Sequence, residues 1–246
     1  MTIRDLNSER LYVDGPLTAG RLLPLSEDQS HYLAHVLRMG EGGEILLFNG
    51  RDGEWRALVE NVKKRVVTLA VDRQVRSQTM AQDIHYLFAP LKRSRLDYMV
   101  QKATELGVSR LCPVMTQFTM AERVNLERMR GNAIEAAEQC GVLTVPEVVG
   151  PQDFRAMLKD WDVSRKLIFC DEDAREENAL ATLSALKRGP LAVLIGPEGG
   201  FSETERALLL GRAFVTRISL GPRVMRADTA AVAALTLVNA TLGDWR

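Results

Sequence analysis

The sequence has little cysteine and histidine, with three of each among 246 residues. The cysteines, Cys112, Cys140 and Cys170, stand far apart, no Cys-x-x-Cys pair occurs, and no histidine stands near a cysteine. A zinc site and a disulfide framework are therefore not expected, and we expect no metal. Free cysteines are typical of a reducing compartment, which predicts a cytoplasmic protein.

Long apolar runs are also missing. The most apolar stretch, 230–238, is far shorter than the roughly 20 residues that span a membrane. The first residues lack the apolar core of a signal peptide. We therefore expect neither a membrane segment nor a membrane partner.

Net charge is missing too, because 32 lysine and arginine residues balance 32 aspartate and glutamate residues. This balance argues against a nonspecific nucleic-acid binder, which is normally basic. The sum conceals a local excess, since the segment 92–110 holds five basic residues and two acidic ones. A basic patch is therefore expected.

Short strands dominate the chain up to residue 75. One helix interrupts them, with Ser26 and Gln29 forming a capping box at its start and Gly40 ending it. Several short strands with one helix predict a small barrel-like domain at 1–75. The expected strands are 10–13, 44–48, 55–60 and 65–71.

Strands alternate with helices in the rest of the chain, after a polar linker at 73–81. This alternation predicts an α/β domain at 76–246, in which helices cover both faces of a parallel sheet. The expected strands are 84–89, 110–114, 166–170, 191–195 and 214–218, and the expected helices are 94–106, 125–140, 152–160, 176–186, 202–210 and 228–242.

The most informative segment is 191–205. An apolar run of strand length is followed by Gly-Pro-Glu-Gly-Gly at 196–200, and then Ser202 and Glu205 predict a helix start with a capping box. Glycine lets a ligand approach the backbone, and N–H groups at a helix start bind polar ligands. The segment matches neither Gly-x-Gly-x-x-Gly nor the phosphate-loop pattern, so a dinucleotide or a triphosphate is not the expected ligand.

A second segment has the same organisation. The strand expected at 214–218 leads to Gly-Pro at 221–222, and an alanine-rich helix follows and ends before Gly243. Ligands of open α/β sheets bind beyond the carboxyl ends of the strands. Two matched loops therefore predict a ligand site, although two ordinary strand–helix turns would give the same pattern.

The two loops also resemble those of a known superfamily. Leu-Ile-Gly-Pro-Glu-Gly-Gly-Phe-Ser at 194–202, with Leu220-Gly221 and Val-Met-Arg-x-Asp-Thr-Ala at 224–230, is similar to the SPOUT superfamily of S-adenosylmethionine-dependent RNA methyltransferases. Within it, the segments 92–108, 10–13 and 36–40 resemble the small-subunit ribosomal RNA uridine-N3 methyltransferases. The similarity extends over nearly the whole chain.

This resemblance carries several expectations. It implies a PUA-like RNA-binding β-barrel followed by a SPOUT-type parallel sheet with a C-terminal trefoil knot. It also implies a homodimer that methylates N3 of a uridine in 16S ribosomal RNA or the small ribosomal subunit, with S-adenosyl-L-methionine as cofactor. The expected cofactor-binding residues, with the strand end at 169–172 nearby, are Leu194, Gly196, Pro197, Gly199, Gly200, Leu220, Gly221, Val224 and Met225.

Uridine N3 becomes a nucleophile only as its proton leaves, so the enzyme must accept that proton or stabilise the resulting anion. Arg226 is the candidate for anion stabilisation, because a guanidinium presents several donors. Glu198 and Asp228 are the candidate bases. Each has a structural alternative: Asp228 as a helix cap, Glu198 as a support of its own loop, and Arg226 as an ion-pair partner.

Five basic residues are candidates for RNA contact, and a solvated surface is the alternative for each. They are Arg10, Arg38, Lys92, Arg93 and Arg95. Two segments lack the basic residue that relatives carry there, which weakens the expectation of RNA contacts at 116–120 and 139–143.

Other functions remain open at this point. A noncatalytic RNA-binding protein of ribosome assembly would keep the same fold. A SPOUT methyltransferase acting on transfer RNA would keep the same loops. A nucleotide-dependent α/β enzyme is disfavoured, because both phosphate-loop patterns are absent.

Overall fold

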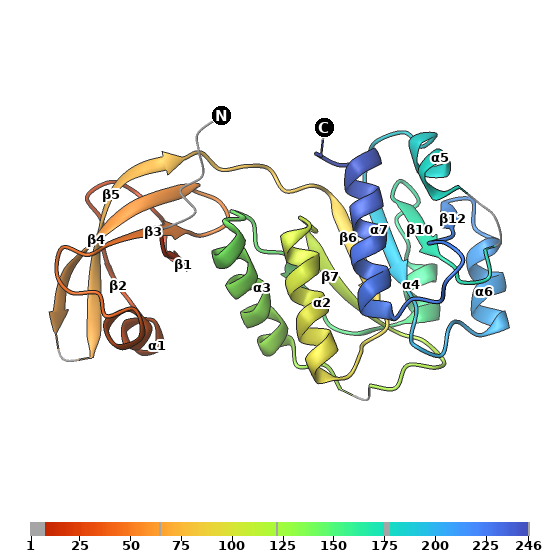
Figure 1. Ribbon diagram of the computed structural model, residues 1–246, viewed down its shortest axis with the longest axis horizontal. Helices are drawn as coiled ribbons and strands as arrows, with labels where there is room; N and C mark the ends of the chain where they lie inside the picture. Colours follow the sequence, from red (N-terminus) through yellow and green to blue (C-terminus); the bar gives the residue numbers. More distant parts are fainter. Residues whose placement is uncertain (1–7, 64, 122, 175–177, 246) are drawn as a thin grey trace. The chain divides into compact units, whose positions relative to one another are not determined.

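The computed structural model describes residues 8–63, 65–121, 123–174 and 178–245 (Figure 1). Contacts group these residues into two compact units. The first unit contains the described residues up to Met80 together with Ala137–Val145, and the second contains Ala81–Ala136 and the described residues from Pro146 onward. The domain limits 1–75 and 76–246 remain a prediction.

The first unit is built on one sheet of five strands in the order β1-β3-β4-β5-β2. β1 pairs with β3 in parallel, and the other neighbours are antiparallel. Buried residues alternate along β5 at Val67, Leu69 and Val71, as a sheet with one buried face requires. The strands are β1 (Arg10–Tyr12), β2 (Leu22–Pro24), β3 (Glu44–Phe48), β4 (Glu54–Lys63) and β5 (Val66–Arg76).

The helix of this unit starts as predicted and ends earlier. Ser26 and Gln29 form the capping box of α1 (Glu27–His31), which continues as the π-helical turn η1 (Tyr32–Val36). The predicted end at Gly40 is wrong, because the chain turns at Arg38, which has a φ of 54°. The Met39 N–H donates to the Leu33 carbonyl at 2.9 Å, closing the helix as a Schellman motif does.

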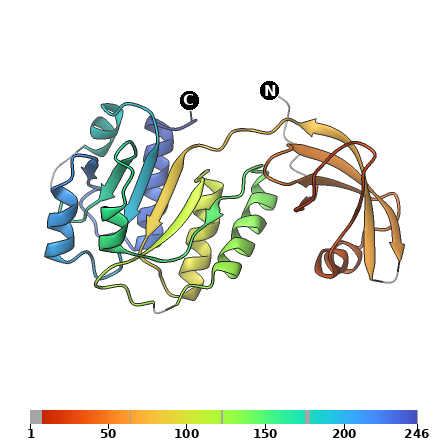
Figure 2. The same cartoon turned by 180° about the vertical axis from the view of Figure 1, so that it is seen from behind.

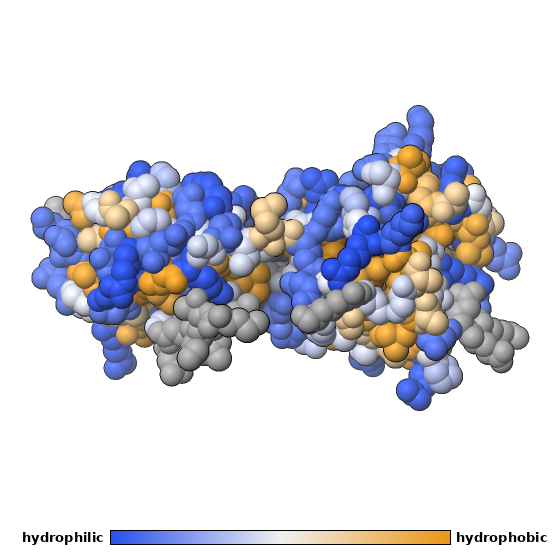
Figure 3. Space-filling view, turned by 90° about the horizontal axis from the view of Figure 1, so that it is seen from above, coloured by the Kyte–Doolittle hydropathy of each residue, from blue (hydrophilic) through white to orange (hydrophobic). Residues whose placement is uncertain are grey.

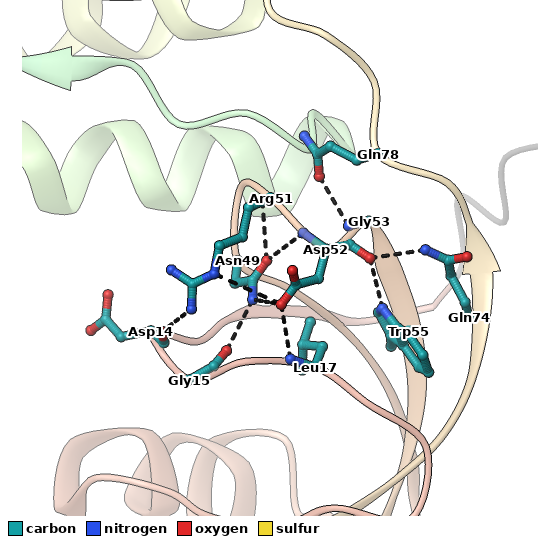
Figure 4. A network of polar contacts seen from close by, with 10 residues as sticks. All are labelled: Asp14, Gly15, Leu17, Asn49, Arg51, Asp52, Gly53, Trp55, Gln74 and Gln78. Carbon is teal, nitrogen blue, oxygen red and sulfur yellow. Dashed lines mark hydrogen bonds and ion pairs between the residues drawn. The ribbon is translucent and has the colours of Figure 1, made fainter.

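The turn between β3 and β4 anchors the loop that follows β1 (Figure 4). Asn49 Nδ2 donates to the Gly15 carbonyl at 2.9 Å and to Asp52 Oδ2 at 2.6 Å. Asp52 Oδ2 also accepts from the Leu17 N–H at 2.9 Å. The bonds from Leu17 and Asn49 lower the pKa of the Asp52 carboxyl. At neutral pH the ionised Asp52 carboxylate therefore holds the turn and the loop together.

The second unit contains the predicted parallel sheet (Figure 2). Its strand order is β12-β10-β11-β6-β7-β8, with β9 pairing to β7, and every pair is parallel. The strands are β6 (Ile84–Phe88), β7 (Arg110–Met115), β8 (Glu147–Val148), β9 (Gln152–Asp153), β10 (Lys166–Cys170), β11 (Leu191–Ile195) and β12 (Val215–Ile218).

Helices cover both faces of this sheet, so its central strand is buried throughout. All five residues of β11 are buried. On one face the cluster around Leu87, Phe169 and Leu194 includes residues of α4 and α6. On the other face the Tyr86 hydroxyl lies 3.0 Å from Sδ of Met99 in α2, and α7 packs against α2. The helices are α2 (Arg93–Glu105), α3 (Leu126–Cys140), α4 (Phe154–Lys159), α5 (Ala179–Ser184), α6 (Glu203–Leu210) and α7 (Ala227–Thr241).

Candidate active site

The two glycine loops leave the same edge of the second sheet. Since all its strands are parallel, β10, β11 and β12 end together. The Asp171 N–H donates to the Ile218 carbonyl at 3.0 Å, and the Ala89 N–H donates to the Ile195 carbonyl at 3.2 Å. Four loops therefore start at this edge, which is where ligands of α/β sheets bind.

The first loop, 196–202, packs tightly against its surroundings. A Cβ on Gly196 would lie 2.5 Å from Cε2 of Phe201, so only glycine fits under this ring. The Phe201 ring in turn packs edge-on against Phe169, with centroids 5.2 Å apart. Gly200 has a φ of 73° and lies against the carboxylate of Glu172. Contacts within the protein therefore define the shape of this loop.

The helix after this loop is closed by its own side chains. The predicted capping box of Ser202 and Glu205 is confirmed. Glu205 is buried, and its Oε1 also accepts from the Gln117 N–H at 2.8 Å. The N–H groups of Ser202 and Glu205 are therefore used within the protein.

The second loop, 219–226, is open. Gly221 has a φ of 106°, and a Cβ there would meet no atom within 4 Å. The Val224 side chain is 92% exposed. Arg226 is the N-cap of α7 and forms no side-chain cap bond. Asp228 is not the N-cap residue: it lies in the first turn, where its Oδ1 accepts from the Thr229 N–H at 2.9 Å.

The structure brings two of the predicted site residues together. Glu198, a candidate base in the first loop, forms an ion pair with Arg95, a candidate RNA contact in the first turn of α2. Both side chains are partly exposed, at 46% and 34%. Arg226 forms no ion pair within the described part of the chain, so its charge is not neutralised there.

The Asp171 carboxylate, directly after β10, organises this edge of the sheet. The Asp171 side chain is 3% exposed and accepts from Arg217 Nε at 2.6 Å and from Arg206 Nη2 at 2.9 Å. Arg206 also pairs with Asp173. Two cations from α6 and β12 thus hold this strand end. The sequence indicated the strand end at 169–172, but the two arginine partners of Asp171 were not predicted.

Glu172 follows this buried carboxylate. Burial and the neighbouring Asp171 charge raise the pKa of its carboxyl, and Arg206 opposes them. Its carboxylate faces Gly200 of the first loop. The β10 end therefore contributes to the shape of that loop. Contact of 169–172 with the cofactor stays a prediction.

The candidate RNA contacts fall into two groups. Lys92, Arg93 and Arg38 are exposed. Arg10 is 6% exposed, and its Nε lies 3.0 Å from Glu54 Oε1. Since that guanidinium is used inside the first unit, the expectation that Arg10 contacts RNA is not retained.

Arg76 completes this buried ion pair. Its Nη2 lies 3.2 Å from Glu54 Oε1 and donates to the Gly141 carbonyl at 2.7 Å. The segment 139–143 therefore has a structural role in the first unit.

Comparisons with known proteins agree with this arrangement. A family model described as RNA methyltransferase domain matches residues 78–239, and one described as RNA methyltransferase PUA domain matches 25–72. Ribosomal RNA small subunit methyltransferase E of Rickettsia conorii is 30% identical over 231 residues, which are 93% of this chain and 94% of that protein. The chain belongs to this RNA methyltransferase family.

Solved structures of similar proteins extend the comparison. A methyltransferase from Legionella pneumophila, solved with bound cofactor SAM, has a TM-score of 0.85 and 32% identity over 95% of this chain and 97% of that one. Ribosomal RNA small subunit methyltransferase E from Neisseria gonorrhoeae, bound to S-adenosyl methionine, has a TM-score of 0.85 and 25% identity over 97% of this chain and 100% of that one.

These comparisons confirm the expected fold class. A PUA-like β domain precedes an α/β domain with a parallel, SPOUT-like sheet. The trefoil knot stays a prediction. No helix among the described residues is long and apolar enough to cross a membrane.

Proposed function

We propose that this protein transfers a methyl group from S-adenosyl-L-methionine to N3 of a uridine in 16S ribosomal RNA. The proposal depends on the pair of glycine loops that leave one edge of the sheet. Similar proteins of known structure bind this methyl donor. We take small-subunit ribosomal RNA as the substrate because relatives that align over most of this chain are named ribosomal RNA small subunit methyltransferase E.

The residues at the edge fit the methyl donor. Backbone of the first loop lies beside a buried apolar strand end at Leu194, which suits an adenine. The second loop offers half-buried Leu220 and Met225 and the open backbone of Gly221. We assign the ring and ribose to the strand residue Leu194 and the two loops, through Gly196, Pro197, Gly199, Gly200, Leu220, Gly221, Val224 and Met225.

The donor supplies an electrophilic methyl group, and the protein's part is to place N3 of the uracil in line with it. Deprotonation of N3 spreads negative charge over N3 and the two flanking oxygens. We assign its stabilisation to Arg226, whose guanidinium has no described carboxylate partner. Glu198 and Asp228 are the candidate bases, and Glu198 must leave Arg95 to act.

Three further features belong to the proposal. The chain after the loop 196–200 passes through an earlier loop and forms a C-terminal trefoil knot, the enzyme works in the cytoplasm, and it acts as a homodimer. The dimer is supported by apolar surface on the second unit, where hydrophobic residues gather on the face seen in Figure 3. Exposed apolar side chains of that unit include Leu180, Leu210 and Trp245.

The decisive experiment is mass-spectrometric mapping of modified nucleosides in ribosomal RNA from cells that lack this protein. We expect one 3-methyluridine of 16S ribosomal RNA to disappear and to return when the gene is restored. Calorimetry with S-adenosylmethionine and tritiated methyl transfer to purified RNA test the catalytic role directly. Donor binding without transfer would favour a noncatalytic assembly protein, and loss of a methyl group from transfer RNA would favour the other substrate.

A further inference from the structure

A cavity of about 320 Å³ opens in the second unit where α2 and α3 begin. None of its lining residues belongs to the loops 196–202 and 219–226, so it is separate from the proposed donor site. Four basic side chains line it, and one acidic side chain does: Lys92, Arg93, Arg123, Arg128 and Asp97.

One of the four cations is already neutralised. Arg128 donates to Asp97 from Nη2 at 2.6 Å to Oδ2 and from Nε at 2.9 Å to Oδ1. Asn132 Nδ2 adds a bond to Oδ1 at 2.7 Å. The Arg128 bonds lower the pKa of the Asp97 carboxyl, so the pair stays ionised at neutral pH. This pair fixes one wall of the cavity and adds no net charge.

The other three cations remain available. Lys92, Arg93 and Arg123 are exposed and form no ion pair within the described ranges, and the Arg93 charge also helps to lower the pKa of the nearby Asp97 carboxyl. Mutual repulsion of three cations around one cavity is relieved by an anion. Lys92 is also the N-cap of α2 and makes no side-chain cap bond, which leaves backbone N–H groups open on the same side.

The inner lining is apolar. Leu91, Leu96 and Met129 are buried, at 7%, 8% and 1% exposure. The cavity thus combines exposed cations with buried apolar side chains. One nucleotide of a single strand fits this combination, because its phosphate is anionic and its base has an apolar face. The volume lies within the range of cavities that hold small ligands.

We propose that this cavity holds one unpaired nucleotide of the RNA substrate, outside the methylated uridine, with its phosphate against Lys92, Arg93 and Arg123. The proposal rests on the proposed function only for the identity of the ligand as RNA. Arg95, two residues beyond Arg93 on the same helical turn, contacts Glu198 of the first glycine loop. A nucleotide in the cavity therefore anchors the RNA on the helix that also contacts the donor loop.

The test compares Arg123→Ala with Arg155→Ala, since Arg155 is an exposed arginine of α4 outside the cavity. Binding of a 16S ribosomal RNA fragment is measured as a function of KCl concentration. We expect Arg123→Ala to weaken binding several-fold at low salt. The slope of log K against log salt should become shallower by about 0.7–0.9, the effect of one lost phosphate contact. Arg155→Ala should behave as wild type, and Arg123→Lys should keep the slope.

Cross-linking gives a second, independent readout. RNA containing 4-thiouridine should cross-link to peptides that include 91–97 or 123–129 of the wild-type protein, and less to those of Arg123→Ala. Unchanged slope and unchanged cross-links in Arg123→Ala, with methyl transfer intact, would overturn the cavity proposal alone. Failure of the wild-type protein to bind or methylate any RNA would overturn both proposals.

Discussion

The two glycine loops of the second unit have similar sequences but different local structures. The first is held by Phe201 over Gly196, by Glu172 beside Gly200 and by the Ser202–Glu205 box. The second has Val224 almost fully exposed, and its N-cap residue Arg226 forms no side-chain cap bond. A Gly-Pro pair at a strand end therefore does not by itself decide whether a loop is preformed, because the neighbouring side chains decide it.

We infer that the two loops have different roles. In the proposed mechanism, we expect the first loop to bind the methyl donor with little change of shape, and the second loop to become ordered around the donor and to present Arg226. The following experiments test this comparison, starting with the largest expected effect.

Replacing Arg226 in the open loop should have the largest effect. Arg226→Ala should lower kcat by about 10²- to 10³-fold, as the loss of one donor to a developing anion typically does. Donor affinity should change little, because the side chain acts on the uracil. Methyl transfer at saturating RNA measures kcat, and calorimetry measures donor affinity. Near-normal turnover would remove Arg226 from the mechanism.

Hydrogen exchange should separate the loops directly. With the donor at 100 times its Kd, backbone amides of 221–226 should exchange up to about 100-fold more slowly, if only the ordered loop binds donor. The Gly200 N–H already donates to the Pro197 carbonyl at 2.9 Å, so it should change less. Mass spectrometry of labelled peptides gives both rates. Equal protection of the two loops would contradict the comparison.

Adding one methyl group tests the rigidity of the first loop. Gly196→Ala should destabilise the protein by about 1–3 kcal/mol, because its Cβ overlaps the Phe201 ring. Gly199→Ala is the matched control in the same loop, since its Cβ would lie 3.4 Å from Cβ of Phe118, an ordinary contact. That control should change stability by about 0.5 kcal/mol or less. Urea unfolding measures both, and equal effects would sink the argument.

The ion pair of Arg95 and Glu198 should contribute little to stability. Both side chains are partly exposed, so a double-mutant cycle with Arg95→Gln and Glu198→Gln should give a coupling of about 1 kcal/mol or less. The coupling should decrease in 1 M salt. A larger value that is insensitive to salt would mean that this pair, rather than Phe201 packing, holds the first loop.

The smallest effect is expected from Glu172. Its carboxyl pKa is raised in the folded state, mainly by burial, so the charged form opposes folding once the pH exceeds the unfolded pKa. Glu172→Gln should therefore be stabilising at pH 7, by about 0.5 kcal/mol or less. This gain in stability should vanish at low pH, where the Glu172 carboxyl is protonated and neutral in both the folded and the unfolded protein. Thermal unfolding at the two pH values checks this, and a loss of stability at pH 7 would contradict it.

The sequence predicted the features that depend on local signals. The strand Leu191–Ile195 and the strand Lys166–Cys170 have the predicted limits, because each is a continuous apolar run bounded by polar or turn residues. Both capping boxes formed as predicted, since a box needs only two residues three positions apart.

Features that depend on distant residues were not predictable. Asp171 is organised by Arg206 and Arg217, which lie 35 and 46 positions away. Arg10 looked like a surface cation because its partner Glu54 is 44 residues distant. The helix end at Arg38 was missed because arginine is uncommon at positive φ, where glycine is favoured.

The stretch Ala137–Val145 belongs to the first unit, although it follows residues of the second unit in the sequence. Its residues Ala137 and Leu143 form a small apolar cluster with Phe48. The first unit is therefore built from two separate segments of the chain, the described residues up to Met80 and Ala137–Val145. An isolated fragment ending at Met80 would leave that cluster incomplete. Recombination could not exchange the N-terminal module at a single breakpoint, so the two halves of this enzyme are expected to be inherited together.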